Sequence, residues 1–229
     1  MNALPYRCFS VGCAVWLAAA TLASAEVTLK GLVGPEIIHD DAVIPRNTLC
    51  VLDRTEIWGS VRVLAGARLV TFQADIQGNI RARNAARIDL RLFTTVGGNV
   101  RGEGARSIIV RSGTRVDGNV RLEDSSAPVG TDALLVVNTT VIGNVVAVAN
   151  SGLVRTAISS IGGNVVYKNN GRGSYLIRGN LIAGDIRFLR NRGPGIIAVN
   201  RVKGDLHSEG NSPDPSIANN LVDGDTKID

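Results

Sequence analysis

The sequence predicts an all-β fold: a single-stranded, right-handed parallel β-helix of about nine coils, each of about 20 residues. A five-residue motif recurs, in the order apolar residue, any residue, glycine, small polar residue, apolar residue. A fixed period of this length is typical of a repeat architecture. No repeat shows the helical period of 3.6 residues, so each coil must bury its apolar face by stacking on the next coil. The motif glycines are Gly59, Gly78, Gly98, Gly118, Gly143, Gly163, Gly184, Gly204 and Gly224.

Apolar residues flank these glycines at positions that share one face of a strand. The residue two positions before each glycine is β-branched, and the residue two positions after it is apolar except at Thr226. Because side chains alternate across a strand, both positions are predicted to point inward. A second row, eight residues before the glycines, predicts another strand in each coil. Its apolar members are Val51, Val70, Leu90, Val110, Leu135, Leu176 and Ile196.

Small polar residues mark the turns. Hydroxyl or amide side chains recur four residues before the glycines and predict ladders in which each side chain hydrogen-bonds its neighbour in the next coil or a backbone group of the turn. The glycine itself predicts a bend with positive φ or a close approach of two backbones. The coil length exceeds the roughly 18 residues of left-handed hexapeptide helices, which favours right-handed winding. The ladder positions are Thr55, Ala74, Thr94, Thr114, Thr139, Ser159, Asn180, Asn200 and Asn220.

The chain divides into three segments. Residues 1–25 read as a signal peptide, since an apolar run ends in small residues, and cleavage near Ala25 would release the protein into the periplasm or the medium. Residues 26–48 are expected to form an N-terminal cap, and residues 49–229 the β-helix, with a loop insertion near 124–131. No run of about 20 apolar residues predicts a transmembrane anchor. After residue 25 Cys50 is the only cysteine, which leaves no partner for an intrachain disulfide.

A row of basic side chains is the strongest functional candidate. Arginine outnumbers lysine 20 to 4 after residue 25, and arginines occupy the position three residues after the glycine in four consecutive repeats. This position is predicted to face outward, so the guanidinium groups would stack along one face with Glu103 and Glu123 as nearby compensating charges. Such a strip suits an acidic polysaccharide, lipopolysaccharide or nucleic acid; the alternative is a solvated, partly paired surface. The candidate binding residues are Arg62, Arg81, Arg101, Arg121 and Arg187.

Catalysis is a second hypothesis. Several β-helix enzymes cleave polysaccharides with stacked carboxylates and a basic residue on the outer surface, commonly with calcium. Asp185, Asp205 and Asp225 recur at one position, and Lys203 would supply a base. Asparagines occupy the same position in earlier repeats, so a role in the turn or in a ladder is the simpler explanation of the aspartates. Two histidines and one cysteine are too few for a zinc site, and no other cofactor is expected.

Self-association is a third hypothesis. A stacked solenoid ends in unpaired strands that can pair with another chain unless they are capped. Only five residues follow Gly224, so the C-terminal coil is expected to be open.

Binding of neutral sugars would call for exposed aromatic rings, whereas Tyr167 and Phe188 are predicted to point inward. The sequence therefore favours a non-enzymatic protein with a structural or acidic-polymer-binding role at the cell envelope.

The repeats resemble those of a group of exported bacterial parallel β-helix proteins with V-x-G-N-V units, whose function is largely uncharacterised. The similarity covers roughly residues 49–225 and rests on TTVGGNV at 94–100, NRVKGDL at 200–206 and the closing stretch NSPDPSIANNLVDGD at 211–225. The resemblance implies a β-helix and export but names no ligand. Members of the group often carry cysteines near the C-terminal end; this chain has none there, so a shared disulfide is not expected.

Overall fold

The computed structural model describes residues 26–229, which form a parallel β-solenoid of about ten turns without a helix. The expected signal peptide and its cleavage site lie outside the described residues. Thirty-one short strands form three parallel sheets, here called A, B and C, and each coil contributes one strand to each sheet. The fold class predicted from the sequence is confirmed.

Sheet A contains eleven strands, and its members are β1 (Val27–Thr28), β4 (Ala42–Ile44), β7 (Val61–Val63), β10 (Ile80–Arg83), β13 (Val100–Glu103), β16 (Val120–Glu123), β19 (Val145–Val148), β22 (Val165–Lys168), β25 (Ile186–Leu189), β28 (Leu206–Glu209) and β31 (Thr226–Ile228). Sheet B contains ten strands: β2 (Gly31–Val33), β5 (Leu49–Asp53), β8 (Arg68–Phe72), β11 (Arg87–Arg91), β14 (Ile108–Arg111), β17 (Asp132–Val137), β20 (Leu153–Ala157), β23 (Tyr175–Arg178), β26 (Gly195–Ala198) and β29 (Ser216–Ala218).

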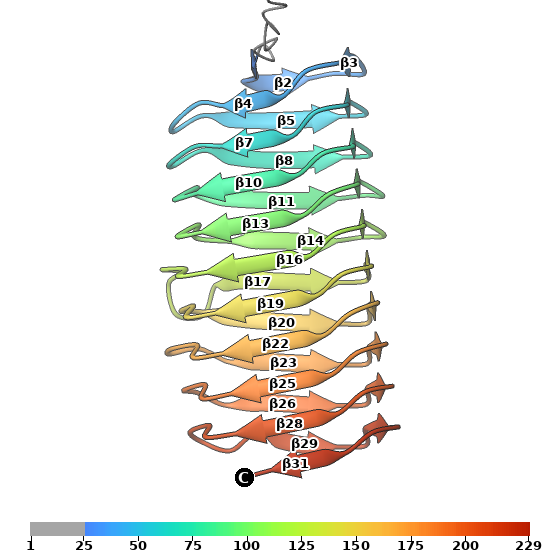
Figure 1. Ribbon diagram of the computed structural model, residues 1–229. Helices are drawn as coiled ribbons and strands as arrows, with labels where there is room; N and C mark the ends of the chain where they lie inside the picture. Colours follow the sequence, from blue (N-terminus) through green and yellow to red (C-terminus); the bar gives the residue numbers. More distant parts are fainter. Residues whose placement is uncertain (1–25) are drawn as a thin grey trace, which may run out of the picture.

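Sheet C is built from ten two-residue strands: β3 (Ile37–Ile38), β6 (Glu56–Ile57), β9 (Asp75–Ile76), β12 (Thr95–Val96), β15 (Arg115–Val116), β18 (Thr140–Val141), β21 (Ser160–Ile161), β24 (Leu181–Ile182), β27 (Arg201–Val202) and β30 (Leu221–Val222). In Figure 1 the nearer strands of sheet A run to the left and the more distant strands of sheet B run to the right while the chain descends, which is a right-handed winding. Sheet C lies along the right-hand edge.

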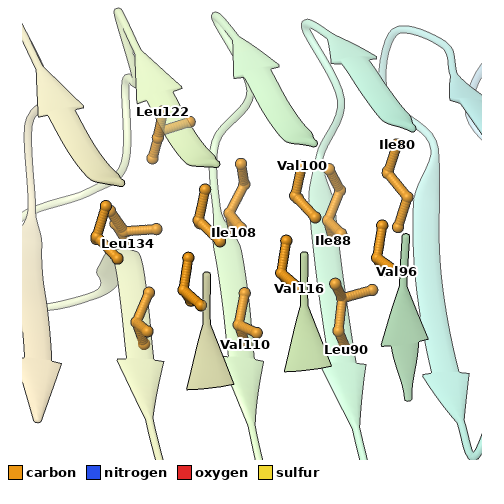
Figure 2. Packing of buried hydrophobic residues seen from close by; sticks show 14 of the residues in the cluster. Ile80, Ile88, Leu90, Val96, Val100, Ile108, Val110, Val116, Leu122 and Leu134 are labelled. Atoms are coloured by element: carbon orange, nitrogen blue, oxygen red, sulfur yellow. The ribbon is translucent and has the colours of Figure 1, made fainter. Parts of the chain in front are cut away.

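The interior is filled by stacked aliphatic side chains from all three sheets. The residues that flank the motif glycine, such as Val96 and Val100, are buried as predicted, except in the last coil, where Val222 is half-buried and Thr226 is exposed. Figure 2 shows how Ile88 and Ile108 of sheet B meet these rows across the interior. Tyr167 and Phe188, the largest fully buried side chains, lie inward as expected, with ring centroids 6.1 Å apart.

Close backbone approach explains the glycine of each repeat. All nine motif glycines lie within the described residues, and none of them has a positive φ. A Cβ built on Gly78 would lie 2.6 Å from the carbonyl oxygen of Gly59, and one on Gly118 would lie 2.7 Å from that of Gly98. The glycine backbones instead hydrogen-bond from coil to coil, as from Gly98 N to Gly78 O at 3.0 Å. Any side chain here would force neighbouring coils apart.

Side-chain ladders seal two of the turns. Between sheets B and C, side chains bond from coil to coil in the later repeats: Asn180 donates to Asn200 at 2.9 Å, and Asn200 donates to Asn220 at 2.8 Å. In the earlier repeats the threonines of this row donate to backbone carbonyl oxygens, as Thr114 does to that of Arg111 at 2.7 Å. A second ladder, between sheets A and B, was not predicted. There Asn170 donates to Asn191 Oδ1 at 2.8 Å and to the carbonyl oxygen of Ala147 at 3.1 Å. Both ladders satisfy buried polar groups of the turns, which would otherwise be costly.

The second strand that the second apolar row predicted is confirmed as sheet B, but the members of that row are not all equivalent in register. Val51 and Val70 lie in an outward row of sheet B that continues through Asp89, whereas Leu90 lies in the inward row. The cause is one extra residue in the turn after β11, where Leu92 and Phe93 both have positive φ. A one-residue shift moves a side chain to the other face of a strand. The turn after β14 carries the same extra residue, with Ser112 and Gly113 at positive φ, and the original offset returns in the shorter turn after β17, where only Asn138 has a positive φ.

The segment expected as an N-terminal cap contains strands of the same solenoid. β2, β3 and β4 pair in parallel with β5, β6 and β7 of the following coil. The insertion near 124–131 appears as the long connection between β16 and β17.

Cys50 is a buried free thiol, and burial raises its pKa to about 11.

The glycine row generates a stability prediction. Replacing Gly118 with alanine should lower the free energy of unfolding by about 1–3 kcal/mol, because the new methyl group would overlap the backbone of the preceding coil. Gly34→Ala is the matched control, since a Cβ there meets nothing within 4 Å, and it should change stability by less than about 0.5 kcal/mol. Urea unfolding followed by circular dichroism measures both. Equal effects of the two substitutions would contradict the role assigned to the glycine.

Candidate functional site

Four of the predicted binding arginines form a continuous column on the outer face of sheet A. Arg62 pairs in register with Arg81, Arg81 with Arg101, and Arg101 with Arg121. The spacing between paired strands is about 4.8 Å, which sets the vertical spacing of these side chains. We call this column the arginine ladder.

The arginine ladder lines a surface groove with a volume of about 890 Å³. One wall of the groove is formed by the asparagines that follow the motif glycines. Asn99 and Asn119 are joined by a 2.9 Å hydrogen bond from the Asn119 side chain to Asn99 Oδ1, and the backbone N–H of Asn119 donates to the same oxygen. These bonds fix the wall, because each amide oxygen is already engaged by the next coil. The groove is lined by residues 62–64, 79, 81–83, 99–101, 103, 119, 121, 144 and 146.

The arginine ladder is only partly neutralised. Glu123 accepts hydrogen bonds from Arg121 and, at 3.0 Å, from Arg101. Arg62 pairs with Glu26 of the first coil. Among residues 26–229, Arg81 has no carboxylate within ion-pair distance. The ladder therefore keeps a surplus of positive charge in the middle of the groove.

One of the two predicted compensating charges lies elsewhere. Glu103 was expected to serve the arginine ladder, but it pairs with Arg83 at 3.1 Å. Arg83 lies two residues beyond Arg81 on the same strand and points to the same outer side, so it competes for Glu103. Arg83 was not among the predicted binding residues, and it adds another guanidinium group to the lining of the groove.

Glu123 is held in its charged form. The hydrogen bond from Arg121 is the main cause that lowers the pKa of Glu123; burial opposes it, and the charge and hydrogen bond of Arg101 add to it. Its carboxylate is consequently ionised at neutral pH and occupies two arginines that would otherwise be open to an external anion. Glu123 acts as an internal competitor for any acidic ligand of the groove.

Arg187, the fifth predicted binding residue, is separated from the arginine ladder. Val146 and Val166 occupy the two intervening positions of the same row. Arg187 pairs with Asp185 at 2.9 Å instead of joining the groove. The next position holds His207, which contacts Glu209 at 3.0 Å.

The groove offers charge but no aromatic platform. None of the residues that line it is aromatic. Stacking against the face of a sugar ring or a nucleic-acid base is therefore not available there. An acidic ligand would be held by guanidinium groups, which suit carboxylate, sulfate and phosphate oxygens.

The residues of the catalytic hypothesis serve the turns of the solenoid. Asp185 Oδ1 accepts the backbone N–H of Asp205 at 3.0 Å, and Asp205 Oδ1 accepts that of Asp225 at 2.8 Å. They thus continue the asparagine wall. Lys203 is an exposed residue in the bend beside this column. Within residues 26–229, no three or more His, Cys, Asp or Glu residues are grouped so that they could hold a metal ion.

The last coil of the described solenoid is acidic. The final strands β29, β30 and β31 are exposed, and residues 205–229 contain six acidic residues and one lysine. The first coil is acidic too, with four acidic and two basic residues in 26–47. Like charges at the two ends oppose head-to-tail stacking of chains.

Comparisons with protein-family models, with curated proteins and with solved structures found no match to this chain. Its functional assignment therefore depends on the surface described above. In the part of the chain that the structure describes, no helix is long and apolar enough to cross a membrane.

Removing the internal competitor should strengthen anion binding. Glu123→Gln frees Arg101 and Arg121 while keeping the size of the side chain, so the affinity for dextran sulfate should rise about two- to fivefold, which corresponds to about 0.5–1 kcal/mol. Isothermal titration calorimetry at constant salt measures this. Glu209→Gln is the control, since that carboxylate is on sheet A outside the groove. An equal gain in the two variants would indicate a general effect of net charge.

Proposed function

We propose that this protein is an exported, non-enzymatic β-solenoid that binds an acidic polysaccharide, such as the glycan of lipopolysaccharide, along the arginine ladder of sheet A at the cell envelope. The observation that carries the proposal is the groove itself. Four arginines from consecutive coils line it in register, and Glu123 offsets only the last two of them, Arg101 and Arg121, in part.

The spacing of the arginine ladder supports a polymeric ligand. Two unit charges about 5 Å apart repel by about 1 kcal/mol even in water, so four stacked guanidinium groups are costly unless anions lie among them. A polymer with one acidic group per monomer supplies a row of anions at comparable intervals. After the first acidic group has bound, each further acidic group of the same polymer adds to the affinity without a second loss of the polymer's overall rotational freedom, as in other multivalent binding.

The rigidity of the groove supports the same conclusion. Its floor is a hydrogen-bonded sheet, and its asparagine wall is linked from coil to coil. A preorganised row of donors loses little conformational entropy when a ligand binds. The binding energy would then come mainly from charge, so it must weaken as salt screens the interaction.

Export is supported by residues 1–25 of the sequence, whose apolar stretch and small residues before Glu26 match a signal peptide. The described part of the chain depends on stacking and ladders for its stability, and its single thiol is buried. Such a protein has no exposed thiol in this part to be oxidised outside the cytoplasm.

The proposal predicts salt-sensitive binding that depends on the arginine ladder. The variant R81Q/R101Q/R121Q should bind polygalacturonate and purified lipopolysaccharide about 10- to 100-fold more weakly than the unaltered protein, because three surface charge contacts of about 0.5–1 kcal/mol are lost. Calorimetry or surface plasmon resonance at several salt concentrations measures the affinity and its salt dependence. Neutral dextran, which should not bind, is the negative control.

The matched control removes the same number of charges from later coils. Arg172, Arg178 and Arg201 are exposed, and R172Q/R178Q/R201Q should leave binding within about threefold of the unaltered protein. Equal losses in both triple variants would show that net charge, not the groove, governs binding. Shortening of the polygalacturonate during incubation would contradict the non-enzymatic role.

A further inference from the structure

The outer face of sheet B carries an apolar row that one carboxylate interrupts. Val51, Val70, Asp89, Ile109 and Leu135 stand at equivalent positions in consecutive coils. Asp89 is nevertheless fully buried, and its neighbours Val70 and Ile109 are buried as well. A buried carboxylate needs hydrogen-bonded partners.

Three arginines supply those partners. Arg87 donates to Asp89 Oδ2 at 2.7 Å, Arg91 donates to the same oxygen, and both Nε and Nη2 of Arg111 reach the carboxylate at 3.4 Å. Burial alone would raise the pKa of Asp89, but the hydrogen bonds and charges of these arginines outweigh it and lower the pKa. Asp89 is therefore an anion at neutral pH, and it fixes three guanidinium groups at one point.

The cluster has more positive charge than its own carboxylate can neutralise. Among residues 26–229, these three arginines pair with Asp89 and with no other carboxylate, so two positive charges remain in excess. Each arginine side chain is still about one-third exposed. Arg91 also lies over the ring of Phe72, 5.6 Å from its centroid, which holds it against the sheet. Several N–H groups are thus fixed in place beside solvent.

Packing alone does not require this cluster. The coils directly before and after fill the same position with Val70 and Ile109, which are buried without any ion pair. A buried ion cluster commonly stabilises a protein no more than apolar residues of similar volume. Its distinctive property is the excess charge of the three arginines that Asp89 holds in position.

The cluster and the arginine ladder lie on opposite sides of the same coils. Sheet A and sheet B face each other across the apolar interior, so their outer surfaces point in opposite directions (Figure 1). Residues 61–122 contain eleven arginines and four acidic residues, which makes this part of the rod basic on both sides.

We infer that Arg87, Arg91 and Arg111 form a second binding site for acidic polysaccharide on sheet B, so that one rod holds two polymer chains and cross-links them. This inference rests on the proposed function, since it assigns the same class of ligand to a second face. The cross-link is non-covalent and needs no cofactor.

The test compares binding stoichiometry with cross-linking. The purified protein should bind two molecules of a heparin octasaccharide per chain by isothermal titration calorimetry. Long heparin chains mixed with the protein should raise light scattering at intermediate ratios and lose it again in excess polymer, as expected for a bivalent binder. The protein without heparin gives the baseline that excludes self-association as the source of scattering.

Two variants separate the faces. Arg87→Gln with Arg111→Gln removes the excess charge on sheet B and leaves Arg91 to pair with Asp89, so the buried carboxylate stays neutralised. R81Q/R101Q/R121Q removes the arginine ladder. Each variant should bind one octasaccharide and should not raise scattering with long heparin, whereas the control R172Q/R178Q should do both as the unaltered protein does.

A second sheet B variant guards against misfolding. Asp89→Leu combined with R87Q, R91Q and R111Q extends the apolar row of Val70 and Ile109 and leaves no buried charge. It should retain the β-sheet circular dichroism spectrum and bind one octasaccharide. One bound octasaccharide in the unaltered protein, or unchanged scattering in both sheet B variants, would overturn the second site and leave the groove of sheet A standing. No binding at all would overturn the proposed function itself.

Discussion

Each coil of this solenoid must lie at a distance of about 4.8 Å from the one before it, because the backbone hydrogen bonds of all three sheets run between coils. The motif glycine is where this requirement is most severe. The backbones meet so closely there that the position cannot hold a Cβ, as the 2.7 Å separation calculated for Gly118 shows. This contact aligns the strand residues on either side of the glycine with their equivalents in the preceding coil.

The same regular spacing turns single residue types into columns. Inside, it stacks Val and Ile into a continuous core; in the turns, it joins amides into ladders that satisfy buried polar groups. Outside, it stacks like charges, which is unfavourable unless something offsets them. On sheet A, Glu123 offsets Arg101 and Arg121 only in part, and on sheet B a single Asp89 faces three arginines. The surplus charge on both faces is the physical basis of the binding proposed here.

Much of this arrangement was predictable from the sequence, because a repeat shows both the length of a coil and which side chains of a strand point inward or outward. The inward rows on both sides of the glycine and the column of Arg62 to Arg121 keep fixed offsets from the glycine, which lies between a strand of sheet C and a strand of sheet A. Sheet B was less predictable, since the turn at Leu92 and Phe93 adds a residue that no local signal marks as an insertion. That shift hid the position of Asp89 in the outward row.

Other features were hidden for different reasons. The arginines around Asp89 come from β11 and β14, and only the register of the two coils brings Arg111 to the carboxylate of the preceding coil. Glu103 pairs with Arg83 and not with Arg81, and the spacing of the repeats alone does not distinguish these two arginines of one strand. The buried ladder of Asn150, Asn170 and Asn191, by contrast, repeats at 20- to 21-residue intervals and was readable in principle.

The measurement that tests the central claim most directly is arginine footprinting with phenylglyoxal, read by mass spectrometry, with and without saturating polygalacturonate. The account predicts that polymer slows the modification of Arg62, Arg81 and Arg101, while Arg172 and Arg201, exposed on later coils, react at the same rate in both samples. Unchanged modification of Arg81 and Arg101 in the presence of bound polymer would contradict it, because the ligand would then lie on another surface of the rod.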